Sequence, residues 1–337
     1  MIERIIIRNF KGIIYGEVNL RQLTIITGPN NSGKTTILEA LLLAGGTENL
    51  PYGYNPFNIL FKSYMILEDR GLEHLIHGYG ITKAKAIIGY IHDGRRSAIS
   101  IDADDSYINI YLLDNVKDFN ESSIEEVLKS QPPIAKFYRF GYGGRYTYKS
   151  FIAKVLYIRS EILMYIYDLM RGKWTEIIGK IVVKDIMNWL SKCLSEKYVD
   201  IVAKISGDRI EALYLYKTDG SGIRFSDLSD GVKLLLGVRI AYEYSKPNIL
   251  LWDDVESHMN PRMMIVLAEW ISELVEDNVQ VILTTHSYEA IRAIASLTVG
   301  EKVKIVRLNL RDGVLKARYY SLNEIEELKN LGIDIRA

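Results

Sequence analysis

A loop near the N-terminus combines two glycines, a lysine and a threonine at a fixed spacing. It contains Gly28, Pro29, Asn30, Asn31, Ser32, Gly33, Lys34 and Thr35. The glycines let the backbone curl so that successive N–H groups face an anion, and a following helix N-terminus adds positive charge. We expect Lys34 to reach the β- and γ-phosphates of a nucleotide and Thr35 to bind Mg²⁺. The alternative, a glycine turn into a buried helix, is disfavoured because a predicted strand precedes the loop.

The second candidate is an apolar run that ends in carboxylates. Residues 248–252 read as a buried strand, Asp253 and Asp254 follow it directly, and Glu256 is close behind. Ligands of open α/β sheets bind at the carboxyl ends of the strands. We therefore expect Asp253 to hold the Mg²⁺ shell and Asp254 to orient an attacking water, a task that Glu256 could share. Alone, the pattern could be a strand that runs into a charged turn.

Two further segments carry polar groups suited to the same phosphates. Residues 281–287 read as another buried strand with a polar end, so His286 is expected at the same sheet edge, close to a γ-phosphate. The segment 228–231 precedes an amphipathic helix, and its Ser229 and Gly231 suit an anion contact at the helix N-terminus. The alternatives are a structural histidine and an ordinary helix cap.

The elements that must position these groups come from both ends of the chain. Alternating apolar patterns predict strands over 2–8, 13–18 and 23–27, and a helix follows over about 33–43. From Ser229 onward helices and strands alternate, as a mainly parallel sheet requires. The sequence therefore predicts a core sheet assembled from the first and last parts of the chain.

The middle of the chain predicts two smaller parts. Turn signals separate three short strands of an antiparallel sheet, at 84–91, 97–101 and 107–113. A surface excursion is expected over 45–60 and a helix over 64–77, and the pattern over 151–197 is helical. We divide the chain into residues 1–150 with the phosphate loop and antiparallel strands, 151–205 as a helical lobe, and 206–337 with the remaining motifs.

Composition excludes several classes of protein. The formal net charge is zero, so no overall basic field attracts nucleic acid or membranes. The one cysteine, Cys193, excludes an internal disulfide and fits a reducing cytosol. No apolar run reaches the ~18 residues of a membrane span, and the charged start does not match a secretory signal, so we expect a cytoplasmic protein that does not enter membranes. The near absence of glutamine is typical of a thermophilic source.

Together these motifs resemble the ATPase heads of the SMC, RecF and OLD families, the DNA-associated branch of the ABC ATPases. Compact OLD-like ATPases without a nuclease domain look most similar. The resemblance covers about residues 1–45 and 220–337, and it depends on the segments 7–11, 28–36, 228–231, 253–256 and 284–287. It implies an α/β P-loop NTPase fold with a mainly parallel core sheet, an antiparallel β subdomain and a helical lobe.

The same resemblance implies cofactors and a partner. ATP and Mg²⁺ are expected, with Thr36 completing the phosphate loop. In these families two heads close face to face on two ATP molecules. The resemblance therefore implies a homodimer in which Ser229, beside Gly231, contacts the γ-phosphate held by the other copy.

Three departures from the family pattern refine this hypothesis. Leu-Ser-Asp-Gly over 228–231, where transporters usually have Leu-Ser-Gly-Gly, favours the SMC and OLD side. Asp254 stands where the family usually has a glutamate, which predicts slow hydrolysis. The family's glutamine loop is not clear, and Gln131 is its candidate.

Three functions remain open from the sequence. The leading hypothesis is a dimerising ATPase coupled to DNA maintenance, repair or anti-phage defence, acting with DNA or a partner nuclease. The second is the ATP-binding subunit of a membrane transporter, and the third is a nucleotide-gated scaffold with negligible turnover.

Residues 136–149 interleave basic and aromatic side chains, a composition suited to phosphate contact and base stacking. The alternative is a β-hairpin that turns at 141–144, with its aromatic rings paired across the strands. We favour the hairpin.

Overall fold

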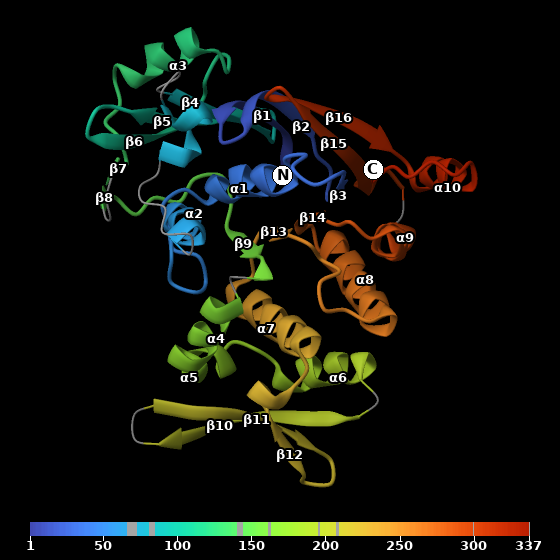
Figure 1. The fold of residues 1–337 in the computed structure, drawn as a ribbon. Coiled ribbons are helices and arrows are strands. Elements are labelled where there is room, and N and C mark those ends of the chain that lie inside the picture. The colour runs from blue at the N-terminus through green and yellow to red at the C-terminus, as the bar shows by residue number, and fades with distance from the viewer. Residues whose placement is uncertain are drawn as a thin grey trace.

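The computed structural model describes residues 1–65, 73–80, 85–139, 144–160, 163–194, 196–206, 209–298 and 300–336. Within these residues the strands form one sheet of thirteen strands and one of three. Figure 1 shows the large sheet in the upper part of the molecule and the small sheet at the bottom, with helices between them.

The large sheet takes its strands from both ends of the chain, in the order β8-β7-β6-β5-β4-β1-β2-β16-β15-β3-β14-β13-β9. In that order the strands span Gly144–Tyr146, Ala135–Tyr138, Tyr107–Leu113, Arg95–Ala103, Lys85–His92, Ile2–Phe10, Ile13–Asn19, Val314–Tyr320, Val303–Arg311, Leu23–Thr27, Gln280–Thr284, Ile249–Trp252 and Val155–Ile158. The five from β15 to β9 pair with one another in parallel. Those from β8 to β2 pair antiparallel. The predicted α/β fold, with a parallel core and an antiparallel part, is confirmed.

The helices are α1 (Lys34–Leu42), α2 (Pro56–Met65), α3 (Glu121–Leu128), α4 (Leu163–Gly172), α5 (Trp174–Ile178), α6 (Val183–Cys193), α7 (Asp230–Ser245), α8 (Pro261–Glu276), α9 (Tyr288–Leu297) and α10 (Leu322–Asn330). Helices α4 to α6 lie within the predicted helical stretch and pack near the small sheet in the lower part of Figure 1. That sheet contains β10 (Tyr198–Ser206), β11 (Arg209–Lys217) and β12 (Gly222–Arg224).

The prediction of a surface excursion over 45–60 is wrong. Helix α2 begins in its second half, and Phe57 and Leu60 are buried in the core. Leu50 and Tyr52 in its first half are also buried. Asn55 caps this helix by accepting a hydrogen bond of 2.8 Å from the backbone N–H of Asn58. Of the helix predicted over 64–77, residues 66–72 lie outside the described residues, and short 3₁₀ turns span Glu73–Leu75 and His77–Gly80.

The predicted boundaries of the helical lobe also need correction. The stretch that begins at residue 151 contains β9, which pairs with β13 in the core sheet. At the other end, the boundary after residue 205 separates β10 from its antiparallel partner β11. Strand β9 belongs to a sheet whose other strands are distant in the sequence, so the local helical pattern did not indicate it.

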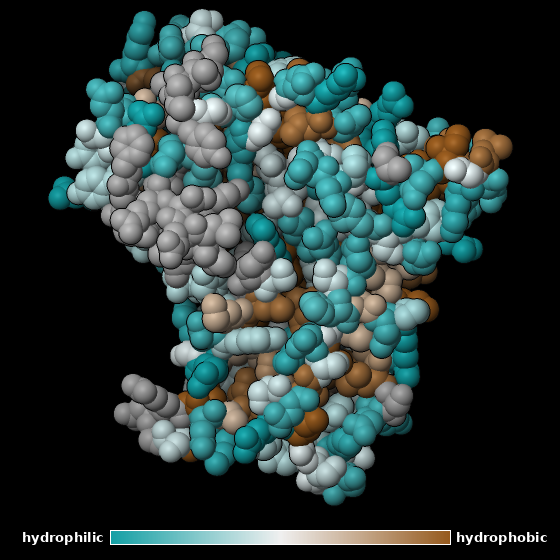
Figure 2. Space-filling model, in the orientation of Figure 1, coloured by the Kyte–Doolittle hydropathy of each residue, from teal (hydrophilic) through white to brown (hydrophobic). Residues whose placement is uncertain are grey.

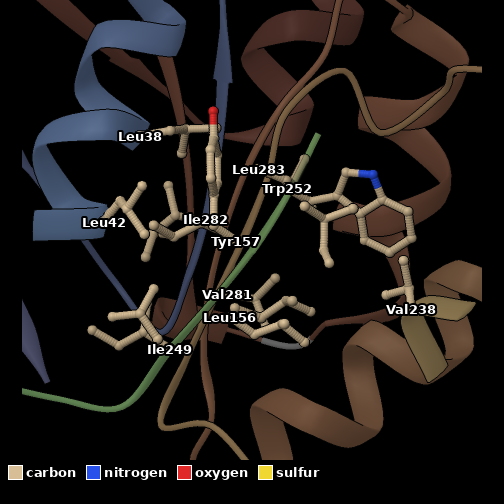
Figure 3. Close-up of a cluster of buried hydrophobic side chains, with 14 of the residues drawn as sticks. Leu38, Leu42, Leu156, Tyr157, Val238, Ile249, Trp252, Val281, Ile282 and Leu283 are labelled. Carbon is tan, nitrogen blue, oxygen red and sulfur yellow. The ribbon is translucent and has the colours of Figure 1, made fainter. Parts of the chain in front are cut away.

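The core lies on both faces of the parallel strands (Figure 3). Leu38 and Leu42 of α1 lie against one face, whereas Trp252 extends from β13 toward Val238 of α7 on the other. All four side chains are buried. Strands covered on both faces need continuous apolar runs, and polar groups are then confined to the strand ends, where they meet at one edge of the sheet.

Figure 2 shows that one face of the molecule is largely hydrophilic, with hydrophobic residues gathered where the molecule narrows below the large sheet. No helix among the described residues has both the length and the apolar character needed to cross a bilayer.

Candidate functional site

The phosphate loop lies between β3 and α1, as the sequence predicts. Gly28 has a φ of 141°, and a Cβ there would lie 2.4 Å from the carbonyl oxygen of Leu308 in β15. Only glycine fits this close approach of two backbones. At the other end of the loop, α1 begins after Gly33 without a side-chain cap. The first N–H groups of α1 are therefore left for another acceptor, as a phosphate-binding helix requires.

Lys34 folds back over this loop. Its ammonium group donates hydrogen bonds to the carbonyl oxygens of Gly28 (3.0 Å) and Pro29 (2.9 Å). Burial lowers the pKa of Lys34, and the nearby carboxylates of Asp254 and Asp253 act in the opposite direction. The side chain is thus held inside the curl of the loop, close to the acidic strand end.

A cleft of ≈ 690 Å³ joins the loop to two other predicted segments. It is lined by Gly12, Asn30, Asn31, Ser32, Gly33, Lys34, Thr35, Thr36, Asp254, His286 and Leu310. The structure therefore brings together the phosphate loop, the acidic end of β13 and the histidine that follows β14. This volume is within the range of small-molecule sites, roughly 300 to 1,000 Å³.

Asp253 connects three of these elements. Its Oδ2 accepts a hydrogen bond of 2.8 Å from the Thr35 hydroxyl in α1. Its Oδ1 accepts one of 2.5 Å from the Thr284 hydroxyl at the end of β14. Burial raises the pKa of Asp253, while the two threonine hydrogen bonds lower it. A buried carboxylate beside a threonine hydroxyl offers the hard oxygen donors that Mg²⁺ prefers.

The next two acids have different surroundings. Asp254 is exposed at the cleft, and its backbone has a φ of 50°. Its backbone N–H donates to the Thr284 hydroxyl at 2.8 Å. Glu256 is partly buried, and its Oε1 accepts a hydrogen bond of 2.6 Å from the backbone N–H of His286. Asp254 therefore faces the cleft, whereas one oxygen of Glu256 holds the segment that carries His286.

Residues 228–231, called the signature segment because they stand where the resembled families have their signature motif, do not line this cleft. Ser229 is exposed at the N-terminus of α7 and makes no capping hydrogen bond with its side chain, so the simple helix-cap interpretation is wrong for this residue. Asp230 pairs with Lys233 at 2.8 Å. Among the described residues that line the cleft, neither Ser229 nor Gly231 is present. Ser229 is thus exposed and does not use its side chain to cap its own helix.

Sequence reasoning missed Arg159, which directly follows β9. It lines a smaller cavity of ≈ 110 Å³ together with Thr35, Asp253 and Asp254. Its guanidinium nitrogen Nη1 lies 3.7 Å from Oε1 of Glu39, a buried carboxylate that also pairs with Lys11. Gln131, the candidate for the glutamine loop, is instead exposed after α3 and lines neither cavity. The signal in the sequence that could have indicated Arg159 is the short apolar run of β9, which is followed directly by this charged residue.

The basic and aromatic segment forms the favoured hairpin, with residues 140–143 outside the described part. Strands β7 and β8 pair antiparallel, and the rings of Phe137 and Tyr146 stack across them at 6.3 Å. The Lys136 ammonium lies 3.9 Å from the centre of the Tyr107 ring. A cavity of ≈ 400 Å³ beside the hairpin is lined by Tyr107, Lys136, Tyr138, Gly144 and Arg145.

Two family models match the chain. The model described as "AAA domain, putative AbiEii toxin, Type IV TA system" matches residues 81–292. The model described as "AAA ATPase domain" matches residues 1–77, which include the phosphate loop. No curated protein matches the chain.

Solved structures of SMC heads have the same fold. An Smc head bound to the C-winged helix domain of ScpA is 16% identical, with a TM-score of 0.57, and the match covers 97% of this chain and 99% of that one. An Smc head with an extended coiled coil, bound to the C-terminal domain of ScpA and derived from Pyrococcus furiosus, is 13% identical with a TM-score of 0.57. That match covers 98% of each chain. The fold is therefore that of an SMC-like ATPase head.

Proposed function

Because this chain belongs to the AAA-domain family whose model matches residues 81–292, we propose that it binds Mg-ATP in the cleft and hydrolyses it slowly. The observation that carries the proposal is the pair of hydrogen bonds from Thr35 and Thr284 to Asp253. They join the phosphate loop, the acidic strand end and the strand before His286 in one network. A glycine turn into a buried helix does not require such a network.

Each group then has a defined task. The backbone N–H groups of the loop and of the first turn of α1 bind the phosphates, and Lys34 exchanges the carbonyls of Gly28 and Pro29 for phosphate oxygens. Thr35 and Asp253 would hold Mg²⁺, which would supply positive charge beside the bound phosphates. Asp254 orients the attacking water, since it is exposed at the cleft, and His286 contacts the γ-phosphate.

We further propose that two copies close on two nucleotides. Ser229 is exposed and makes no hydrogen bond that caps its own helix. In a face-to-face dimer, Ser229 and Gly231 at the N-terminus of α7 would meet the γ-phosphate bound by the partner. The Ser229 hydroxyl and the Gly231 N–H would then add to the donors of the cleft, whose described lining in a single copy includes neither residue.

ATP affinity, turnover and oligomeric state measured on one preparation test both statements. We expect ATP to bind, to turn over slowly and to convert monomers into dimers in light scattering. Lys34→Ala should lose tight ATP binding and dimerisation but keep its melting temperature, because Lys34 contacts loop carbonyls and not the apolar core. If Lys34→Ala binds ATP as tightly as the wild type, residues 28–35 are not the phosphate-binding loop.

The partner that we propose is DNA, engaged at the cavity beside the β7–β8 hairpin. Tyr138 is 52% exposed there, and Lys136 and Arg145 add positive charge. Stacking of bases on exposed rings beside cations is the chemistry of single-strand binding. Turnover should rise with single-stranded DNA in the wild type and not in Lys136→Ala/Arg145→Ala. If DNA changes the turnover of neither protein, a protein partner such as a nuclease replaces DNA in the proposal.

One observation favours a second candidate, a nucleotide-gated scaffold with negligible turnover. Asp254 carries a carboxylate one methylene shorter than the family's usual glutamate. ATP-dependent dimerisation without measurable product in single-turnover experiments would select the scaffold over the slow ATPase.

A further inference from the structure

The backbone of His286 is held on both sides of its Cα, through two successive peptide groups. Its N–H donates to Oε1 of Glu256 at 2.6 Å. Its carbonyl oxygen accepts a hydrogen bond of 3.0 Å from Nη1 of Arg336, which lies 50 residues further along the chain. One clamp therefore comes from the segment after β13 and the other from the segment after α10. A side chain whose backbone is held on both sides of the Cα has fewer orientations available than one on a loop without such contacts.

Arg336 is itself oriented by a carboxylate. Its Nε donates to Oδ1 of Asp334 at 2.8 Å, and its Nη2 donates to Oδ2 at 2.7 Å. This two-pronged contact holds the plane of the guanidinium and leaves Nη1 for His286. The Arg336 hydrogen bonds lower the pKa of Asp334 to about 2, so the contact persists throughout the neutral range.

The backbone next to Arg336 is anchored to the core sheet. Nε of Arg307 in β15 donates to the carbonyl oxygen of Ile335 at 2.7 Å, and the Ile335 side chain is 6% exposed. Strand β15 pairs with β3, which leads directly into the phosphate loop. Arg307, which anchors the backbone next to Arg336, is therefore in the strand that neighbours β3, the strand that leads into the phosphate loop.

We propose that Arg336 is a positioning residue that sets the orientation of His286 toward the bound nucleotide. This inference rests on the proposed function, because it assumes that His286 contacts the γ-phosphate. Arg336 touches the His286 backbone and does not line the cleft among the described residues. Its loss should therefore affect the chemical step more than the binding of ATP.

The test compares Arg336→Ala and Arg336→Lys with the control Arg292→Ala. Arg292 lies in α9, four residues after Tyr288, and is exposed, with an ion pair of 3.5 Å to Glu326 of α10. We expect Arg336→Ala to lower single-turnover hydrolysis on the order of tenfold. ATP affinity should stay unchanged, because misplacing a group that acts in the transition state lowers turnover alone. Arg336→Lys should fall between, since lysine cannot hold Asp334 with two prongs and reach His286 as well.

Hydrogen exchange supplies a readout that does not depend on ATP hydrolysis. Amides of residues 284–290 should exchange faster in Arg336→Ala than in the wild type or in Arg292→Ala. Unchanged exchange would overturn the clamp. Faster exchange with wild-type turnover would overturn the positioning role. If the wild type neither binds nor hydrolyses ATP, the proposed function is wrong, and so is the role of Arg336 in nucleotide chemistry. Hydrogen exchange would still test whether Arg336 holds the backbone of His286.

Discussion

Gly231 lies directly against the backbone of His258. A Cβ at Gly231 would lie 2.1 Å from the carbonyl oxygen of His258, closer than real Cβ atoms approach. His258 belongs to the segment that follows Asp253 and Asp254, and its own φ is 62°. The N-terminus of α7 is therefore seated on the loop that follows the acidic strand end. Because the two backbones are in contact, a displacement of that loop should also displace Ser229, two residues before Gly231.

We expect Gly231→Ala to push α7 away from this loop. Overpacking of this kind typically costs about 1 to 3 kcal/mol, and it would also displace Ser229. The melting temperature should fall, and light scattering should show less of the ATP-dependent dimer. Gly172→Ala is the control, because a Cβ there meets nothing within 4 Å. Equal melting temperatures for Gly231→Ala and the wild type would mean that the loop yields without cost.

Ser229→Arg should weaken the ATP-dependent dimer without lowering monomer stability. Ser229 is exposed and makes no capping hydrogen bond, so arginine can be accommodated in the monomer. A bulky cation there would obstruct closure onto the nucleotide of the partner. Light scattering of both proteins with Mg-ATP checks this. A dimer of undiminished affinity would show that the signature serine does not lie at the closing surface.

Asp254→Asn should slow hydrolysis and prolong the ATP-bound dimer, whereas Asp254→Glu should preserve or raise turnover. Asparagine tolerates the left-handed backbone of this position, at a φ of 50°, about as well as aspartate, so the change removes charge without disturbing the turn. Glutamate at this position adds backbone strain of about 1 to 2 kcal/mol, so the melting temperature of Asp254→Glu should fall. Its longer side chain should nevertheless reach further toward the water.

Single-turnover hydrolysis and ATP affinity, measured on these three proteins, separate the two effects. Affinity should change little, because Thr35 and Asp253 remain to hold the metal. If Asp254→Asn hydrolyses ATP at the wild-type rate, the water is oriented by another group. Glu256 then becomes the first candidate, since its Oε2 has no hydrogen-bond partner among the described residues.

Asp253→Asn should stabilise the nucleotide-free protein at neutral pH while it weakens Mg-ATP binding. Burial raises the pKa of Asp253 in the folded state, so the folded protein holds this proton more tightly than the unfolded chain. The favourable contribution is complete below the ordinary aspartate pKa of about 3.9 and is lost as the pH rises through the raised value. We expect the asparagine variant to gain on the order of 1 kcal/mol at neutral pH.

Melting temperatures between pH 4 and 8, without nucleotide or metal, would test this sign. The difference between Asp253→Asn and the wild type should grow as the pH rises. Asp277→Asn, on the exposed end of α8, is the control for replacing an aspartate at the surface. A variant less stable than the wild type at neutral pH would contradict the expected cost of burying this carboxylate.

The parts of the site that the sequence predicts are those encoded locally. The phosphate loop is continuous in sequence, and Asp253 and His286 follow apolar runs long enough to identify as buried strands. The carboxyl ends of parallel strands meet at one edge, so these three segments could be brought together without a structure. The contact of Glu256 with the backbone of His286 could not, because it depends on how two loops turn after their strands.

Other elements were missed for different reasons. Helix α2 has a local signal, an Asn55 cap followed by Pro56 in the first turn, but the glycines and prolines before it favoured a loop. Strand β9 has only four residues, and its partner β13 begins at Ile249, so no local pattern reveals its place in the sheet. Arg159 directly follows β9, so it was not identified from the sequence because the strand before it was not.

The interleaving of both chain ends in the large sheet also governs how the molecule folds. The Gln280 side chain holds the backbone of Ile2 with hydrogen bonds of 2.9 and 2.7 Å across 278 residues of sequence, and β3 lies between β14 and β15. Contacts so distant along the chain carry a large loop-closure cost and slow the search for the native topology. On the ribosome the phosphate loop emerges before its partners Asp253 and Thr284, and Asp253 is made 218 residues after Thr35. The nucleotide site therefore cannot be completed before Thr284 has been made, and until then the central strand β3 of a nascent chain lacks its neighbours β14 and β15.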